Sequence, residues 1–357
     1  MTLSAEPHAL TLEAFHTAVR GEALEPLWLQ PDGAMTAEPV TPFRPYRWRW
    51  HAVRERMLQA GALLPVGKEG AARRVLIFRN PGAPRGAPTT PTLGAAIQLV
   101  LPGEQAPSHR HSPAAIRFII EGRDACTIVD GEPCTMTPGD LILTPSWSWH
   151  GHVNAGAGPI FWLDVLDVPL VASLYQFFYE DYPDGLEPAR RAPDASLARY
   201  GAGILLPQDA PPAHGDSPLL RYPWAVTEAR LRALADAPGD PFDGVLLTYT
   251  HPYTGGPVMP TMTCRIQLLR PGEHTRAHRH TASVVYHVVR GRGTTLVEGT
   301  ALDWEAGDVL ALPGWVWHEH VNAAPDAEAI LFSVSDEPVL RALGLYREEP
   351  RAATPDA

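Results

Sequence analysis

A long internal repeat constrains this chain more than any other feature of its sequence. Residues 102–154 hold a Pro-Gly-Glu turn, a His-Arg-His triplet, a Gly-Asp turn and a Trp-His-x-His-Val-Asn segment, and residues 265–335 hold the same features in the same order. His278 follows His109 by 169 positions and His318 follows His150 by 168, so one deletion in a loop accounts for the difference. Self-similarity in a single register predicts two copies of one structural unit.

The repeated segments read as short β-strands separated by tight turns. The chain contains 38 Pro and 30 Gly, and Gly, Pro or Asp bounds nearly every apolar run. This spacing is typical of an all-β sandwich or barrel. In the first copy we expect strands over residues 74–78, 92–101, 116–121, 125–129, 134–136, 141–144 and 160–168.

The remaining segments differ from the repeats. Helical patterns cover Leu10 to Phe15 with Thr11 as the cap, Trp48 to Ala62, and Thr227 to Ala235 with Thr227 as the cap. Residues 170–182 are apolar and aromatic, and are expected to be a loop or helix that packs across the barrel or between subunits. The predicted units are an N-terminal helical segment (1–65), a first β-domain (66–182), a linker with a short helix (183–240), a second β-domain (241–346) and a flexible tail (347–357).

Charge and cysteine content narrow the classes of partner. The formal net charge is −11 and no cluster of Lys or Arg forms a basic face, which argues against nucleic acid and anionic membranes as partners. The three cysteines form no C-x-x-C pair, which favours a reducing compartment. With neither a secretory signal nor an apolar run of membrane-spanning length, the sequence predicts a cytoplasmic protein.

Three histidines of the first repeat are candidate metal ligands. His109 and His111 are separated by one residue, so they point to the same face of a strand, and His150 arrives on a later strand. Three imidazoles held in this way suit a first-row divalent metal. The most specific interpretation is a non-haem iron site with open positions for substrate and oxygen. The alternative is a set of barrel-interior histidines without a metal.

The motifs resemble those of a known family. The pattern P-G-x6-H-x-H, a Gly turn, P-G-D and P-x4-H resembles the cupin jelly roll, and its duplication resembles a bicupin. The residues within and around these motifs most closely resemble those of gentisate 1,2-dioxygenases and their salicylate- and 1-hydroxy-2-naphthoate-cleaving relatives. The residues that carry this resemblance are His109-Arg110-His111, Arg117-Phe118, Thr144-Pro145-Ser146-Trp147, Trp162-Leu163-Asp164, His278-Arg279-His280-Thr281 and the run from Gly256 to Met262.

The ligand set predicts the kind of substrate. Residues 112–120 contain neither Asp nor Glu, where many cupins supply a carboxylate ligand, so the triad of His109, His111 and His150 is neutral. A neutral triad leaves Fe(II) its full positive charge, which favours a chelating anion such as a ring with adjacent hydroxyl and carboxylate groups, and leaves a position for O2.

Four further residues are candidates for contacting the substrate. Arg117 lies on an otherwise apolar strand and is either a clamp on the substrate carboxylate or half of a salt bridge to a strand neighbour. Arg73 resembles a second carboxylate-binding arginine, although strand parity leaves open whether Arg73 or Arg74 faces the site. Gln98 and Asp164 are candidates for binding or orienting the substrate, with an ordinary buried polar network as the alternative.

His152 and the second repeat complete the candidate residues. His152 resembles an acid/base or hydrogen-bonding group near the substrate hydroxyl, and the alternative is a histidine at the surface end of a strand. His278, His280 and His318 repeat the ligand pattern and form a possible second metal site. Tyr286 stands where the first repeat has Arg117, so turnover is expected only in the first β-domain.

These observations converge on one expected activity. The resemblance implies a Fe(II)-dependent dioxygenase that cleaves gentisate with O2 to maleylpyruvate, and a homotetramer. The alternative substrates are salicylate and 1-hydroxy-2-naphthoate, and the alternative class is a non-catalytic metal-binding bicupin. Gly94 is small where some salicylate-cleaving relatives carry Trp, which favours gentisate or a bulkier ring.

Overall fold

The structure, a computed structural model, describes residues 11–29, 36–67, 71–84, 86, 88–208 and 215–352. Residues 1–40 and 41–357 form two separate compact units. In the first unit, helix α1 (Leu12–Gly21) precedes the 3-10 turn η1 (Leu27–Leu29). The Thr11 hydroxyl accepts a hydrogen bond from the Ala14 backbone N–H at 3.1 Å, which confirms the predicted cap. Leu10, where the helix was expected to open, lies outside the described residues.

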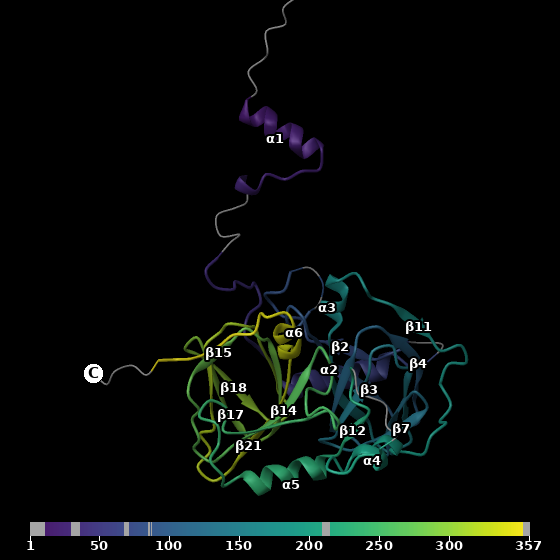
Figure 1. Cartoon of the computed structure of the whole chain (residues 1–357). Helices are drawn as coiled ribbons and strands as arrows, with labels where there is room; N and C mark the ends of the chain where they lie inside the picture. Colours follow the sequence, from purple (N-terminus) through teal and green to yellow (C-terminus); the bar gives the residue numbers. More distant parts are fainter. Residues whose placement is uncertain are drawn as a thin grey trace, which may run out of the picture. The chain divides into compact units, whose positions relative to one another are not determined.

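The second unit consists of two β-barrels, each built from a six-stranded and a five-stranded sheet, which confirms the all-β, two-copy prediction (Figure 1). The first barrel contains β12 (Arg221–Tyr222), β8 (Leu141–Thr144), β5 (Ala115–Glu121), β10 (Ile160–Leu166), β3 (Gly94–Val100) and β2 (Val75–Ile77), opposite β11 (Tyr179–Asp181), β4 (Gln105–His111), β9 (His150–Asn154), β6 (Ala125–Val129) and β7 (Glu132–Met136). The second contains β1 (Tyr46–Trp48), β19 (Val309–Leu312), β16 (Val284–Arg290), β21 (Ala329–Ser335), β14 (Thr263–Leu269) and β13 (Val245–Thr248), opposite β18 (Thr300–Glu305), β17 (Arg292–Val297), β20 (His318–Val321), β15 (His278–His280) and β22 (Glu348–Pro350).

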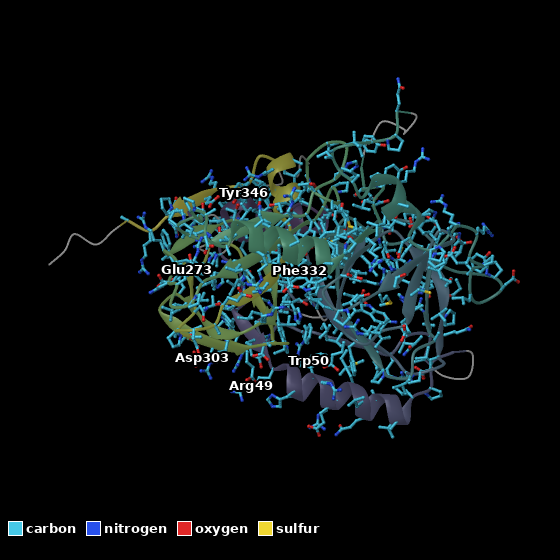
Figure 2. The ribbon with its side chains drawn as sticks, turned by 90° about the horizontal axis from the view of Figure 1, so that it is seen from below. Arg49, Trp50, Glu273, Asp303, Phe332 and Tyr346 are labelled. Atoms are coloured by element: carbon cyan, nitrogen blue, oxygen red, sulfur yellow. The ribbon has the colours of Figure 1, made fainter. Side chains whose placement is uncertain are left out.

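The two barrels share a core between their six-stranded sheets. Because side chains alternate along a strand, Ile116 and Phe118 face the other barrel while Arg117 faces the interior of its own. Phe118 stacks on Phe332 of β21 with ring centroids 4.2 Å apart, and Figure 2 shows Phe332 between the barrels. These strands are therefore buried on both faces, which explains why they read as nearly continuous apolar runs rather than as alternating patterns.

Each barrel borrows one strand from the segment that precedes the other barrel. Strand β1 pairs with β19 of the second barrel, and β12 pairs with β8 of the first. The Trp50 backbone N–H donates to Asp308 at 2.8 Å, and the Trp224 N–H donates to Asp140 at the same distance. These bonds begin helices α2 (Trp50–Leu63) and α5 (Trp224–Leu234). The internal repeat recognised in the sequence did not include these two crossing segments.

Glycine is required where these crossing segments dock. Gly139 and Gly307 occupy the Pro-Gly-Asp and equivalent Ala-Gly-Asp turns with φ angles of +88° and +95°. A Cβ atom on Gly139 would lie 2.5 Å from the Trp224 ring, and one on Gly307 would lie 2.4 Å from the Trp50 ring. The turns are therefore shaped both by positive φ and by the indole packed against them.

Three expectations about the connecting segments were wrong. Trp48 lies in β1 rather than in the following helix, because its backbone completes a sheet. Thr227 is not a cap but a residue inside α5, whose N-cap is Pro223. The tail was expected to be flexible after Arg347, yet β22 pairs with β15; residues 353–357 lie outside the described residues. The predicted domain boundaries as a whole stay a prediction.

Three short helices complete the second unit. The segment 170–182 supplies most of α3 (Val168–Ser173) and all of β11, which pairs with β4. Within the predicted linker, α4 (Ala195–Tyr200) lies next to β12. Helix α6 (Glu337–Ala342) follows the last strand of the second barrel as α3 follows β10. Among the described residues, every helix is too short or too polar to cross a membrane.

Candidate metal and substrate site

The first barrel brings three histidines together. His109 and His111 lie on β4, and antiparallel pairing with β9 places His150 directly opposite His109. One nitrogen from each ring lies within 4.8 Å of the other two. A single ion could therefore contact all three imidazoles, as the spacing predicted.

The second ring nitrogen fixes two of these imidazoles. Nδ1 of His111 lies 2.7 Å from the Pro113 carbonyl oxygen, and Nδ1 of His150 lies 2.9 Å from the Ser148 carbonyl oxygen. Because a carbonyl can only accept, each Nδ1 carries the proton and each Nε2 keeps its lone pair. This backbone support presets the tautomer that a metal ligand needs.

The triad is uncharged at neutral pH. Burial lowers the pKa of His109 to about 2 and that of His111 to about 4. After burial, the positive charge of Arg73 contributes most to the lowered pKa of His109, and the positive charge of Arg117 also lowers the pKa of His111. Burial followed by Arg117 holds the pKa of His150 well below its ordinary value. Neutral imidazoles bind a divalent cation without first losing a proton, so the donor set fits a first-row metal.

Arg117 faces the barrel interior and is only 3% exposed. Its Nε lies 3.2 Å from Oδ1 of Asp164, its register partner on β10, and its Nη1 donates to Thr144. The Nε–Oδ1 contact is close enough for an ion pair but is misaligned for a hydrogen bond. The salt bridge to a strand neighbour, one of the two interpretations of Arg117, is therefore present. Arg117 also lines a cavity, and its role as a clamp on the substrate carboxylate stays a prediction.

The structure distinguishes the two neighbouring arginines. Arg74 points away from the triad and binds Glu104, with Nη2 2.7 Å from Oε1. Arg73 lines the cavity, and its Nη2 lies 3.4 Å from the His150 carbonyl oxygen. Burial, followed by the positive charge of Arg117, lowers the pKa of Arg73 to about 10. Two positive charges therefore stand beside the triad.

These groups line a cavity of about 530 Å³ that combines polar and apolar residues. The polar lining residues are the triad, both arginines, Gln98 and Asp164. The Gln98 Nε2 is buried without a hydrogen-bond partner among the described residues, and Asp164 accepts a bond from the Trp162 indole at 2.8 Å. The apolar lining residues are Val75, Ile77, Pro88, Gly94, Ala95, Ala96, Leu166, Val168 and Pro169.

His152 is buried rather than placed at the surface end of a strand. It is 1% exposed and packs on Trp162 with ring centroids 4.7 Å apart. Its Nδ1 lies 3.0 Å from the Thr127 hydroxyl, and its Nε2 has no hydrogen-bond partner among the described residues. It is not one of the residues that line the cavity, so its catalytic role stays a prediction.

Sequence reasoning missed the contribution of β11 to the site. This strand covers β4 at the barrel edge, with Tyr179 opposite His111. The ring centroids of Tyr179 and His109 are 5.1 Å apart. The segment gave only an apolar, aromatic signal, and its pairing with the histidine strand depends on long-range folding.

The second barrel gathers an equivalent triad. One nitrogen of each of His278, His280 and His318 lies within 4.8 Å of the other two. Nδ1 of His280 lies 2.9 Å from the Ala282 carbonyl oxygen, and Nδ1 of His318 lies 3.0 Å from that of Val316. The duplicated motif therefore reproduces the geometry of the first triad.

Comparison with known proteins places these features in a family. The cupin domain model matches residues 96–166 and 265–335, which are the central parts of the two barrels. A 5-aminosalicylate 1,2-dioxygenase from Comamonas sp. is 44% identical over 349 residues, which span 96% of this chain and 91% of the relative. This chain belongs to the gentisate and salicylate 1,2-dioxygenase family.

Other members support the same placement. Gentisate 1,2-dioxygenase 1 from Aquipseudomonas alcaligenes is 38% identical, with 96% of this chain and 98% of the relative covered. The crystal structure of salicylate 1,2-dioxygenase from Pseudoaminobacter salicylatoxidans as a gentisate adduct superposes with a TM-score of 0.89 at 32% identity, covering 99% of this chain and 98% of the other. The bicupin, ring-cleaving dioxygenase prediction is confirmed at the level of the family.

Proposed function

We propose that the first barrel binds Fe(II) and cleaves the ring of an aromatic 2-hydroxycarboxylate, with gentisate as the leading substrate. The observation that carries this proposal is the lining of the cavity. Three neutral imidazoles, Arg73 and Arg117 line it together with apolar residues. An aromatic acid has the complementary chemistry, because it joins a carboxylate and a hydroxyl to an apolar ring.

The residues of the cavity have distinct proposed roles. His109, His111 and His150 hold the iron, which would supply the electronic coupling between a chelated aromatic acid and O2. Arg73 and Arg117 bind the substrate carboxylate and fix the orientation of the ring. Among the described residues that line the cavity, the only carboxylate is Asp164, and its pairing with Arg117 limits its repulsion of the anion.

The proposed reaction balances without a further reductant. Gentisate and one O2 combine, the bond between the carbons that carry the carboxylate and the 2-hydroxyl breaks, and both oxygen atoms remain in maleylpyruvate. His152 is proposed to take the hydroxyl proton at Nε2, because burial keeps its imidazole neutral and Thr127 holds Nδ1. Gln98 is proposed to donate a hydrogen bond from its free Nε2, and Asp164 to orient Arg117.

A second substrate is favoured by the comparison. The Comamonas relative is named for 5-aminosalicylate, which carries an electron-donating group at the same ring position as gentisate. Gly94 lines the cavity without a side chain, and a Cβ atom there would meet Pro169 at 3.7 Å, an ordinary van der Waals contact. Salicylate and 1-hydroxy-2-naphthoate remain the competitors to be measured beside these two compounds.

Oxygen uptake tests the proposal. Protein reconstituted anaerobically with Fe(II) is mixed with each of the four acids in air-saturated buffer, and O2 consumption and the ring-opened product are followed. We expect one O2 consumed per gentisate. Iron-loaded protein that consumes no O2 with any of these acids is a non-catalytic bicupin, and the proposed function is then wrong.

The proposal extends to assembly and location. Exposed apolar side chains gather between the end of α3 and the start of β11, and we infer that a second copy of the chain covers them in a homotetramer. Light scattering of the purified chain tests this, and a monomer at assay concentrations would refute it. The three free cysteines support a cytoplasmic location. The exposed residues are Leu174, Tyr175, Phe177, Phe178 and Tyr179.

A further inference from the structure

The second triad lies in surroundings that differ from those of the first. The registers of the two six-stranded sheets align the barrels residue by residue. Tyr286 pairs with Ser333 where Arg117 pairs with Asp164. Gly244 occupies the position of Arg73, because Leu246 faces Gln267 as Val75 faces Gln98. Both arginines beside the first triad are therefore missing from the second.

The space that forms the acid-binding cavity in the first barrel is used differently in the second. Ala96, which lines the cavity, corresponds to Arg265, and Val168 corresponds to Glu337. Arg265 and Glu337 form an ion pair, and the Glu337 carboxylate also accepts a bond from Arg341 at 2.5 Å. Two apolar lining residues are thus replaced by a pair of opposite charges, so the cation brought into this space is already held by a carboxylate.

The second triad carries buried nitrogens that lack partners. His278 and His318 are 3% and 2% exposed. Nδ1 of His278 and Nε2 of His318 have no hydrogen-bond partner among the described residues. Buried polar atoms are rarely left without a partner, because their desolvation is then not offset. These two imidazoles and His280 each bring one nitrogen within 4.8 Å of the other two, and this arrangement points to a cation between them.

A carboxylate stands beside this triad in the strand register. Glu348 of β22 pairs with His280, whereas Tyr179 of β11 pairs with His111 in the first barrel. Arg265 is held by the Glu337 carboxylate. The first barrel differs, because Arg73 and Arg117 line the cavity beside its triad.

We propose that His278, His280 and His318 bind a second divalent metal ion, and that this ion is structural and closed to the aromatic acid. Without the two arginines of the first barrel, the site favours a retained cation over an anionic ligand. The assignment does not depend on the proposed function of the first barrel.

Metal counting in full-length variants tests the assignment. Each protein is loaded anaerobically with Co(II) and desalted, and cobalt per chain is measured by mass spectrometry. We expect two ions in the wild type, one in His109→Ala/His111→Ala, and none when His278→Ala and His280→Ala are added. The matched control is His274→Ala, an exposed histidine of the same barrel that contacts Glu319 at 3.2 Å, and it should retain both ions.

The variant without the first triad isolates the second site. Co(II) should raise its melting temperature by several degrees and gentisate should leave its cobalt absorption unchanged. Zero cobalt in a variant whose circular dichroism is native, or a gentisate-induced spectral change, overturns the proposal. Either outcome is independent of whether the wild type consumes O2.

Discussion

Replacement of Arg117 by Met tests the link between geometry and substrate binding most directly. Met keeps the length and apolar stem of the side chain but removes the guanidinium. A hydrogen bond to a charged group contributes about 1.5–3 kcal/mol. At about 1.4 kcal/mol for each factor of ten, kcat/KM for gentisate should fall roughly 10- to 150-fold. The neutral triad does not include Arg117, so the iron content should stay at the wild-type level.

The same substitution has a separable cost in stability. Arg117 and Asp164 are 3% and 6% exposed, and loss of one partner of a buried pair costs about 3–5 kcal/mol. Asp164 limits this cost by taking a proton, because burial already raises its pKa against the opposing charge of Arg117. Adding Asp164→Asn to Arg117→Met should therefore recover part of the free energy of unfolding without recovering kcat/KM.

The assay separates the two effects. Iron per chain, urea unfolding and O2 uptake are measured for Arg117→Met, Asp164→Asn and the double variant. If Arg117→Met keeps its iron and its kcat/KM stays within about threefold of the wild type, Arg117 does not bind the carboxylate. If iron is lost in proportion to activity, Arg117 supports the metal site instead, and the proposed role is wrong.

Three further predictions follow from the same site. Arg73→Met should lower kcat/KM about tenfold or more with little loss of stability. Arg74→Met should instead lower the free energy of unfolding by about 3–5 kcal/mol and leave kcat/KM within about threefold of the wild type. Urea unfolding and steady-state kinetics check both variants. Gly94→Trp should fill part of the cavity and lower kcat/KM for 1-hydroxy-2-naphthoate at least about tenfold, whereas Gly94→Ala should be tolerated. Steady-state kinetics at equal iron content check this. Equal rates for Gly94→Trp and the wild type would contradict the placement of Gly94 at the substrate cavity. Folding lowers the pKa of His111 from about 6.5 to about 4, so below pH 6.5 the unfolded chain binds protons that the folded chain does not. Metal-free protein should therefore lose stability as the pH falls from 6.5 to 4, and this group should change the stability little above pH 7. Midpoints of urea unfolding that stay constant across pH 4–6.5 would contradict this prediction.

Local patterns were sufficient for some features of this protein and insufficient for others. The triad could be predicted because His109 and His111 share a face by strand periodicity, and the repeat pointed to the third ligand. The choice between Arg73 and Arg74 could not be predicted, because it depends on where β2 begins. The burial of His152 depends on Trp162, which comes from another sheet. Strand pairings such as β1 with β19 join residues more than 250 positions apart and leave no local signal.

The two triads show why a metal motif alone does not locate an active site. Both barrels keep the His-x-His strand and the later histidine, and both fix ring nitrogens with backbone carbonyls. The differences lie on other strands: Arg73 against Gly244, and Ala96 against Arg265. Such positions can gain or lose a positive charge without disturbing the histidine geometry, since they lie in or just before strands of the six-stranded sheets. One duplicated scaffold can therefore build an anion-binding cavity in one copy and a closed cation site in the other.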